Sequence, residues 1–353
     1  MSRLLQVLHP AAVRIAAASY LSAAVTGFAF GQDPEAFYRG KQINLIINSG
    51  AGGGYDVYAR TFSRHFGKHV PGNPVIVAKN LPGAGGLLAA NTLYANSDHE
   101  GLTLAALANT ALFDPLLGSP GTRYDALKLN WLGSIAKVSS VCATYYTSPI
   151  KAVADARTRE VIVAGAGVGT NSVVVPYILN TLLGTRFKVI RGYEAGTGLL
   201  LATERGETDG ICGLSWSTLK ASRPDLVAEK KLNVILQMSL EKLPELPDVP
   251  SVLDLISDPT NKKVLEFFLL RQETGRPFAT APGVPADRVV ALRTAFDATM
   301  ADPEFLADAA KSNLDIEPLT GAQIAQILSS AYALPKDIIE KAAILIEQSS
   351  KAR

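Results

Sequence analysis

The sequence feature that most restricts the fold is an apolar run that ends in a glycine-rich loop and continues as a helical pattern. The run covers residues 44–48, the loop extends from Gly50 to Gly54, and the helical pattern continues through Arg60. This order leaves backbone N–H groups free at a helix N-terminus, where an anion binds readily. Asp56 is also placed to cap the helix and to pair with Arg60, four residues later. We therefore expect ligand contacts from Gly52, Gly53, Gly54, Tyr55 and Asp56.

Further glycine-rich turns repeat this pattern later in the chain. Residues 81–86 read Leu-Pro-Gly-Ala-Gly-Gly ahead of a helical pattern, and residues 165–172 read Gly-Ala-Gly-Val-Gly-Thr-Asn-Ser after an apolar run. Another helix start follows Arg191, which is a candidate counter-charge for an anion. A purely structural role is about as compatible with the turn at residues 81–86, and an arginine after a strand is more often structural or at the surface. If they bind a ligand, the residues involved are Gly85, Gly169, Thr170, Asn171, Ser172, Gly196 and Thr197.

Strand-like runs alternate with helical patterns from Lys41 to Met238. This alternation predicts an α/β fold of parallel sheets with helices on both faces. The strand candidates are residues 43–48, 74–77, 103–108, 139–146, 161–164, 187–191, 210–214 and 233–238. The helix candidates between them are residues 57–69, 87–95, 172–183, 199–207 and 216–230.

The pattern changes after Met238. A proline-rich connector at residues 243–250 leads into helical segments at residues 252–256, 262–271, 286–299 and 323–348. The apolar faces of these helices need a sheet to pack against, and the N-terminal sheet is the best candidate. We therefore predict two lobes with a ligand cleft between them. Lobe 1 is expected to contain residues 32–130 plus 238–353, and lobe 2 residues 131–237.

The N-terminus has the pattern of a signal peptide. Arg3 and Arg14 precede an apolar stretch, and small residues near Gly31 suit a cleavage site. An uncleaved membrane anchor is the alternative. Removing residues 1–31 leaves 32 basic and 32 acidic residues, so the mature chain is formally neutral. Neutrality argues against nucleic acid as a partner, and export places the protein in an oxidising compartment outside the cytoplasm.

The only two cysteines, Cys142 and Cys212, fall in predicted strands of the second lobe. An oxidising compartment permits a disulfide between them. We favour the other interpretation, in which two buried thiols pack as small apolar groups.

The chain lacks a recognisable catalytic set. None of its glycine loops has the dinucleotide-binding spacing, and no Gly-Lys-Ser/Thr phosphate loop occurs. His65 and His69 have a metal-ligand spacing, but Phe66 stands where a zinc protease has glutamate, so a solvent-facing pair is favoured. The segment Gly213-Leu-Ser-Trp-Ser217 lacks the final glycine of a nucleophile elbow. We expect a binding protein that is not an enzyme and uses neither a cofactor nor a metal.

Several motifs resemble the Bug family, the periplasmic solute receptors of tripartite tricarboxylate transporters. They occur in order over nearly the whole mature chain, at residues 37–41, 52–60, 71–74, 80–86, 130–133, 205–210, 246–250, 275–277 and 282–288. The resemblance implies a type II periplasmic-binding-protein fold, two doubly wound lobes and a ligand carboxylate held by facing loops. Many relatives have Ser-Asp after the double glycine, whereas this chain has Gly54-Tyr55-Asp56. Tyr55 is therefore expected to reshape the pocket.

Together these patterns predict a receptor that captures a di- or tricarboxylate, or a related acid, and delivers it to membrane transporter subunits. The alternative is a sensor that docks on a membrane signalling protein when its ligand is bound. A monomer suits a carrier that opens and closes.

Overall fold

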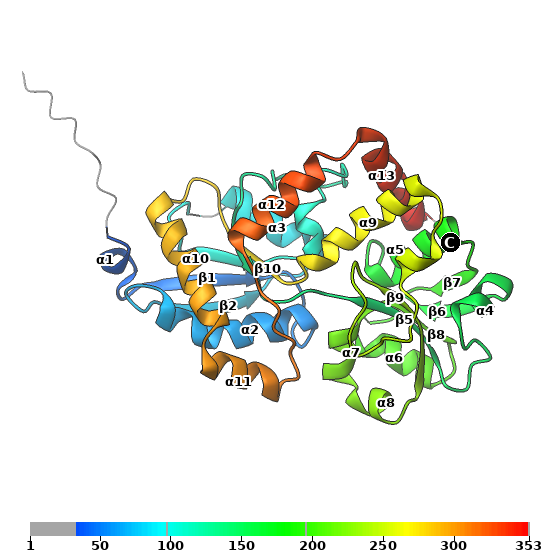
Figure 1. Cartoon of the computed structure of the whole chain (residues 1–353). Helices are drawn as coiled ribbons and strands as arrows, with labels where there is room; N and C mark the ends of the chain where they lie inside the picture. The colour runs from blue at the N-terminus through cyan, green and yellow to red at the C-terminus, as the bar shows by residue number, and fades with distance from the viewer. Residues whose placement is uncertain (1–32, 97, 195, 352–353) are drawn as a thin grey trace, which may run out of the picture. The chain divides into compact units, whose positions relative to one another are not determined.

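The computed structural model describes residues 33–96, 98–194 and 196–351, so the predicted signal peptide lies outside the described residues. Residues 32–353 group as one compact unit, which contains two β-sheets covered by helices (Figure 1). The longer helices are α2 (Gly54–Phe66), α3 (Leu87–Asn96), α5 (Asn171–Leu183), α6 (Thr197–Glu204), α9 (Pro259–Glu273), α10 (Ala286–Met300), α11 (Pro303–Lys311), α12 (Gly321–Tyr332) and α13 (Lys336–Lys351). The shorter ones are α1 (Pro34–Tyr38), α4 (Val153–Thr158), α7 (Trp216–Ser222) and α8 (Pro224–Ala228). Within the described ranges, no helix is both long and apolar enough to cross a membrane.

The first sheet has the strand order β11-β4-β10-β3-β1-β2. Its strands are β1 (Gln42–Ile47), β2 (Val75–Asn80), β3 (Thr103–Ala106), β4 (Asn130–Ser134), β10 (Pro277–Thr280) and β11 (Leu319–Thr320). The strands β1, β2 and β3 are parallel, whereas β10 runs antiparallel to both β3 and β4. The sheet is therefore mixed: the predicted parallel arrangement holds for β1, β2 and β3, whereas β10 and β11 run antiparallel to their neighbours.

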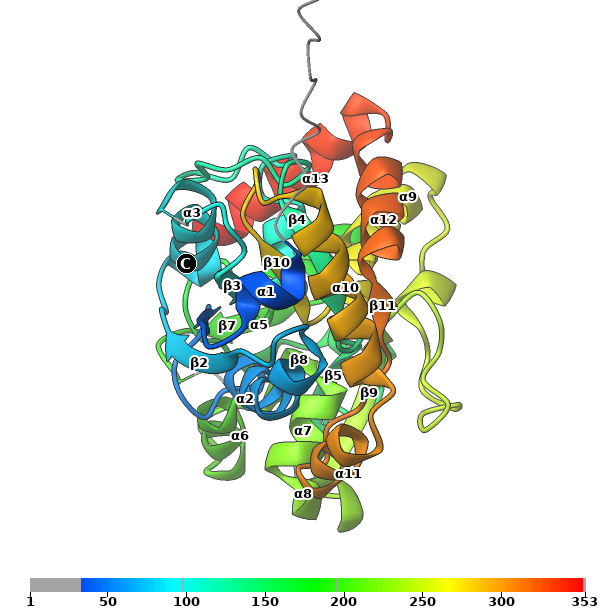
Figure 2. The same ribbon diagram turned by 90° about the vertical axis from the view of Figure 1, so that its left-hand side faces the viewer.

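Both faces of the first sheet are buried, as strand alternation requires. Ile43, Leu45 and Ile47 join a core with residues of α2 and α10. Ala105 and Leu107, on the opposite face of the sheet, pack with residues of α3 and α12. Figure 2 shows α10 and α12 in front of the β4 end of this sheet, and both helices contact β4.

The second sheet has the order β7-β6-β8-β5-β9. Its strands are β5 (Ser140–Tyr145), β6 (Val161–Ala164), β7 (Phe187–Ile190), β8 (Gly210–Ser215) and β9 (Leu232–Met238). Residues of α6 and α7 pack on one face, and residues of α5 pack on the other. The α/β fold with a sheet in each of two lobes is thus confirmed.

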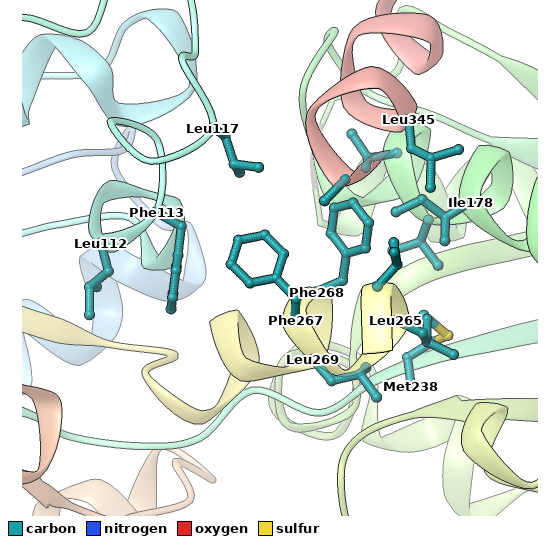
Figure 3. Close-up of a cluster of buried hydrophobic side chains, with 14 of the residues drawn as sticks. Leu112, Phe113, Leu117, Ile178, Met238, Leu265, Phe267, Phe268, Leu269 and Leu345 are labelled. Atoms are coloured by element: carbon teal, nitrogen blue, oxygen red, sulfur yellow. The ribbon is translucent and has the colours of Figure 1, made fainter. Parts of the chain in front are cut away.

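Two segments that cross between the sheets lie against each other. The N–H of Val138 donates to the carbonyl of Gln272 at 2.8 Å, and the N–H of Ile135 donates to that of Arg276 at 3.1 Å. A Cβ at Gly275 would lie 2.2 Å from the side chain of Val138, so only glycine permits this approach. The second segment follows α9, whose Phe267 points toward Phe113 while Phe268 points toward the Leu345 side (Figure 3).

The structure differs from the sequence-based elements in several places. The strands β4, β10 and β11 were not predicted, and the helical pattern at 216–230 is split into α7 and α8 before Pro224. The pattern at 323–348 is likewise interrupted ahead of α13, which begins after Pro335. The division into lobes remains a prediction, but β4 belongs to the first sheet although it lies mostly beyond residue 130. Helix α13, expected in lobe 1, contacts α5 on the second sheet.

Cys142 and Cys212 form a disulfide, so the favoured interpretation of two free thiols is wrong. They are register partners on the adjacent antiparallel strands β5 and β8, with a Cα–Cα distance of 3.8 Å. Both side chains are fully buried. The sequence pattern showed that both residues lie in strands, but strand pairing is what brings them together.

The disulfide closes a loop between residues 70 positions apart and should stabilise the protein by restricting the unfolded chain. Reduction of the wild-type protein is expected to lower the free energy of unfolding by about 2–4 kcal/mol, measured by denaturant titration with and without dithiothreitol. A Cys142→Ala/Cys212→Ala double variant is the control, since reductant should not change its stability. Equal stability of the oxidised and reduced wild-type forms would contradict the prediction.

Candidate functional site

The first glycine loop is held in place by the carboxylate of Asp56. This buried group accepts hydrogen bonds from the N–H of Gly52 at 2.8 Å, Nε of Arg60 at 2.8 Å and Nδ2 of Asn80 at 2.7 Å. The predicted pairing with Arg60 is confirmed. The N-cap of α2, however, is Gly53, and Asp56 lies inside the helix and bonds back to Gly52. Its side chain therefore organises the loop, and the predicted capping role is wrong.

Burial by itself raises the pKa of Asp56, but the hydrogen bonds from Gly52, Asn80 and Arg60 outweigh it and lower the pKa below 3.8. The amides of Gly54, Tyr55 and Asp56 have no internal acceptor among the described residues. The first turn of α2 therefore offers the donors that the sequence predicted. These amides form no hydrogen bond that would contradict a role in ligand binding.

The side chain of Arg276 lies beside this helix start. A Cβ at Gly54 would be 3.1 Å from its Nη2, and its guanidinium lies 4.4 Å from the ring centre of Tyr55. Nη2 reaches the hydroxyl of Thr218 on α7 at 3.5 Å, so this arginine extends from the first lobe to the second. Arg276 is 5% exposed, and its Nε has no hydrogen-bond partner. Its guanidinium therefore lies directly against the first glycine loop.

A cavity of about 690 Å³, here called the main cavity, opens next to the other two turns. Gly85 lines it from the first lobe and Gly169 from the second, so the structure brings these two predicted residues together. Its other lining residues are Ala84, Leu87, Thr110, Asp114, Leu117, Gly118, Ser119, Pro120, Val168, Val174, Arg271, Glu340, Ala343, Ile344, Ile346 and Glu347.

Arg271, at the end of α9, lines the main cavity and a second cavity of about 20 Å³. Its side chain is buried, with 7% exposure, and forms no ion pair within 4 Å with any described residue. Burial lowers the pKa of its guanidinium, which Asp114 partly offsets from a longer distance. The small cavity is also lined by Asn109, whose N–H donates to the hydroxyl of Tyr55 at 3.0 Å.

The remaining predicted residues have varied environments. The hydroxyl of Thr170 donates to the carbonyl of Gly167, and that of Ser172 accepts from the N–H of Ala166 at 3.1 Å, so both stabilise their own loop. Asn171 lines the small cavity. Gly196 and Thr197 begin α6 and line neither cavity. Which of these residues contact a ligand remains a prediction.

Other sequence-based candidates have structural partners. Nη2 of Arg191 donates to the carbonyl of Ser349 at 3.2 Å. His65 and His69 are half-buried and bond to Asp308 and Asp302, each at 3.0 Å, so the solvent-facing interpretation is wrong. His65, Asp302 and Glu304 have ligand atoms close enough for a metal ion. Nζ of Lys68 lies 2.7 Å from the carboxylate of Asp302, so a lysine ammonium group already supplies positive charge to this cluster.

Sequence reasoning missed Arg271 and Arg276. The signal was present, because Arg271 directly follows the run Phe267-Phe-Leu-Leu270 at the end of a predicted helix. A charged residue that directly follows such an apolar run is either exposed at the helix end or buried for a functional reason. Only the three-dimensional contacts distinguish these two cases.

The fold, with a cavity lined from both lobes, defines a class of two-lobed solute-binding receptors. The family described as "Tripartite tricarboxylate transporter family receptor" matches residues 59–344, and the chain belongs to this family. The predicted family is thereby confirmed. Members of the family serve as solute-binding receptors.

Individual relatives agree with this assignment. A UPF0065 protein of Bordetella bronchiseptica is 29% identical over 224 residues, which are 61% of this chain and 63% of that protein, less than two thirds of its length. A protein of R. palustris solved with adipate has a TM-score of 0.65 at 18% identity, covering 86% of this chain and 97% of that one. The periplasmic binding protein BugD has a TM-score of 0.62 at 18% identity, covering 88% and 98%. At such identities the two solved structures establish the fold alone.

Replacing Asp56 by Asn tests its role in holding the loop. At pH 7 the variant should be less stable by about 1–3 kcal/mol, because two or three hydrogen bonds to a charged acceptor are weakened. Since the folded-state pKa is lowered, the carboxylate stabilises the protein above pH 3.8 and loses this effect as the pH falls through the folded-state pKa. The difference in unfolding free energy between wild type and variant should therefore narrow in acid.

Chemical denaturation between pH 7 and pH 3 measures this difference. Asp248→Asn removes an exposed carboxylate and is the control, for which little change is expected. A wild-type-to-Asp56→Asn difference that stayed constant over this pH range would contradict a role for the carboxylate charge.

Proposed function

We propose that this protein is an exported receptor that binds a small organic carboxylate between its lobes and delivers it to a tripartite tricarboxylate-type membrane transporter. The proposal rests on one observation: positively charged side chains are buried where the two lobes meet. Arg271 and Arg276 are 7% and 5% exposed, and no described carboxylate forms an ion pair with either. A buried cation without a partner is unfavourable, so a solute that supplies negative charge is stabilised there.

The backbone supports the same ligand class. The first-turn amides of α2 lie beside Arg276, and the glycine turns at Gly85 and Gly169 face the main cavity. Micromolar binding requires about 8 kcal/mol, and each hydrogen bond to a charged group contributes roughly 1.5–3 kcal/mol. A few such bonds supply this energy after the cost of immobilising the solute. The relative solved with adipate supports a carboxylate for this chain as well.

Contacts between the lobes support a receptor that closes on its ligand. Lys220 on α7 pairs with Asp315, which precedes β11, at 3.3 Å, and Arg276 reaches Thr218. A ligand that contacts both lobes adds its binding energy to these contacts and favours the closed state. The protein acts as a monomer in this proposal, and the closed surface is what the transporter subunits recognise.

A panel of carboxylates tests the ligand class. Each acid is compared with its uncharged amide by thermal unfolding and calorimetry on the protein lacking residues 1–31. At least one acid should stabilise the fold, by about 2.7 kcal/mol when its concentration is a hundred times its Kd, and its amide should do so far less. Stabilisation by neutral sugars or metal ions alone would overturn the proposal.

Export is tested separately by expressing the full chain in a Gram-negative host. The protein should be recovered in the periplasmic fraction, with an N-terminus near residue 32 by sequencing of the purified protein. A variant in which Arg3 and Arg14 are replaced by Glu should remain in the cytoplasm and keep its full length. A wild-type protein that stayed cytoplasmic and uncleaved would contradict export.

A further inference from the structure

The lining of the main cavity is mostly apolar and comes from five parts of the chain, namely residues 84–87, 110–120, 168–174, Arg271 and 340–347. Its volume of about 690 Å³ falls in the range of pockets that enclose drug-sized ligands. The apolar residues include Leu87 and Leu117 from the first lobe and Val174 from α5. Ile344 and Ile346 contribute from α13. Such a space is larger and more apolar than a short dicarboxylate requires.

Two apolar side chains at this cavity are exposed. Val168, in the glycine turn before α5, is 57% exposed, and Ile344 on α13 is 50% exposed. Both line the cavity, so a ligand there would remove their apolar surface from water. Covering such surface is favourable by about 25 cal/mol per Å². The cavity therefore favours an occupant with an apolar body.

Charge is distributed unevenly in the same cavity. Arg271 is buried and without an ion-pair partner, whereas Glu340 and Glu347 on α13 are exposed. Glu347 also pairs with Lys351. Asp114 is half-buried, accepts a hydrogen bond from the hydroxyl of Ser119 at 3.1 Å, and has a pKa raised by burial. The one buried positive group is thus Arg271, and the other charges of the lining are acidic.

We propose that the main cavity binds an amphipathic monocarboxylate, whose carboxylate contacts Arg271 and whose apolar body packs on Leu87, Leu117, Val174 and Ile344. This inference rests on the proposed function and names the ligand class of that receptor. A second carboxylate on the ligand would lie against the apolar lining or near an acidic residue of the lining, such as Asp114 or Glu340. Both positions disfavour a negative charge.

Calorimetry with a homologous series tests the proposal. The probes are butyrate, hexanoate and octanoate, each with its amide, and the dicarboxylates malate and adipate. Affinity should rise about fourfold for each added methylene, because each one is buried against the apolar lining. Octanoate should bind roughly 10- to 100-fold more tightly than octanamide, since only the acid satisfies Arg271.

Arg271→Gln separates the charge contribution from the apolar one. This variant should lose the preference for octanoate over octanamide and should bind the amide about as well as the wild type does. Arg205→Gln removes an exposed arginine that pairs with Glu207 outside the cavity, and it is the matched control. Thermal unfolding without ligand verifies that each variant is folded.

Ala343→Phe tests the location of the apolar body. Ala343 lines the cavity from α13, so a phenyl group there shortens the available space. Octanoate should lose at least tenfold in affinity while butyrate loses less than threefold. Unequal losses of this kind are not expected from a general disturbance of the fold.

Three results would overturn the proposal. In the first, malate or adipate binds more tightly than octanoate, and the Arg271→Gln variant binds these acids as tightly as the wild type does. This result would refute the amphipathic ligand class but would still agree with a carboxylate receptor. An amino acid bound in preference to its deaminated analogue, with the preference lost in Asp114→Asn, would show a zwitterion site instead. Absence of binding by every acid, with binding of neutral solutes, would refute the receptor function itself.

Discussion

The close contact between the two crossing segments determines where the functional groups of this protein lie. Backbone hydrogen bonds join Val138 to Gln272 and Ile135 to Arg276, and Gly275 fits only because it has no side chain. Arg271 and Arg276 flank this contact on one segment. Their guanidinium groups are therefore held in the region between the first and the second sheet. A looser junction would expose both guanidinium groups to water and would remove the desolvation on which the proposed binding of an anion depends.

Arg271 and Arg276 have different surroundings, and only one of them borders the cavities. Arg276 is enclosed by Tyr55, Tyr58 and Thr218 and borders neither the main nor the small cavity. Arg271 borders both of them. Tyr55 lies beside Arg276 and also contributes to the electrostatic environment of Arg271. Tyr55 therefore acts on both arginines, through its ring at Arg276 and electrostatically at Arg271.

Sequence patterns predicted the parts of the fold that depend on local order. The apolar runs at β1, β6 and β8 and the glycine turns after β1 and β6 were recognisable because each is set by neighbouring residues. The strand β10 was not, because it is four residues long, begins with a proline, and is fixed by pairing with β3 and β4 far away in sequence. The disulfide was missed for the same reason, since the register of β5 on β8 is a tertiary property.

The same distinction between local patterns and tertiary contacts applies to the candidate site. Free amides at a helix start follow from a glycine loop and a helical pattern, so the donors of α2 were predictable. The main cavity needs residues 84–87, 110–120, 168–174 and α13 to come together, and no single pattern contains that information. Backbone N–H groups can donate to any carboxylate, because every carboxylate offers the same acceptor oxygen atoms. In the proposed receptor, discrimination between acids therefore depends on the lining, which the sequence did not reveal. This lining is mostly apolar and contains one buried arginine together with Asp114, Glu340 and Glu347.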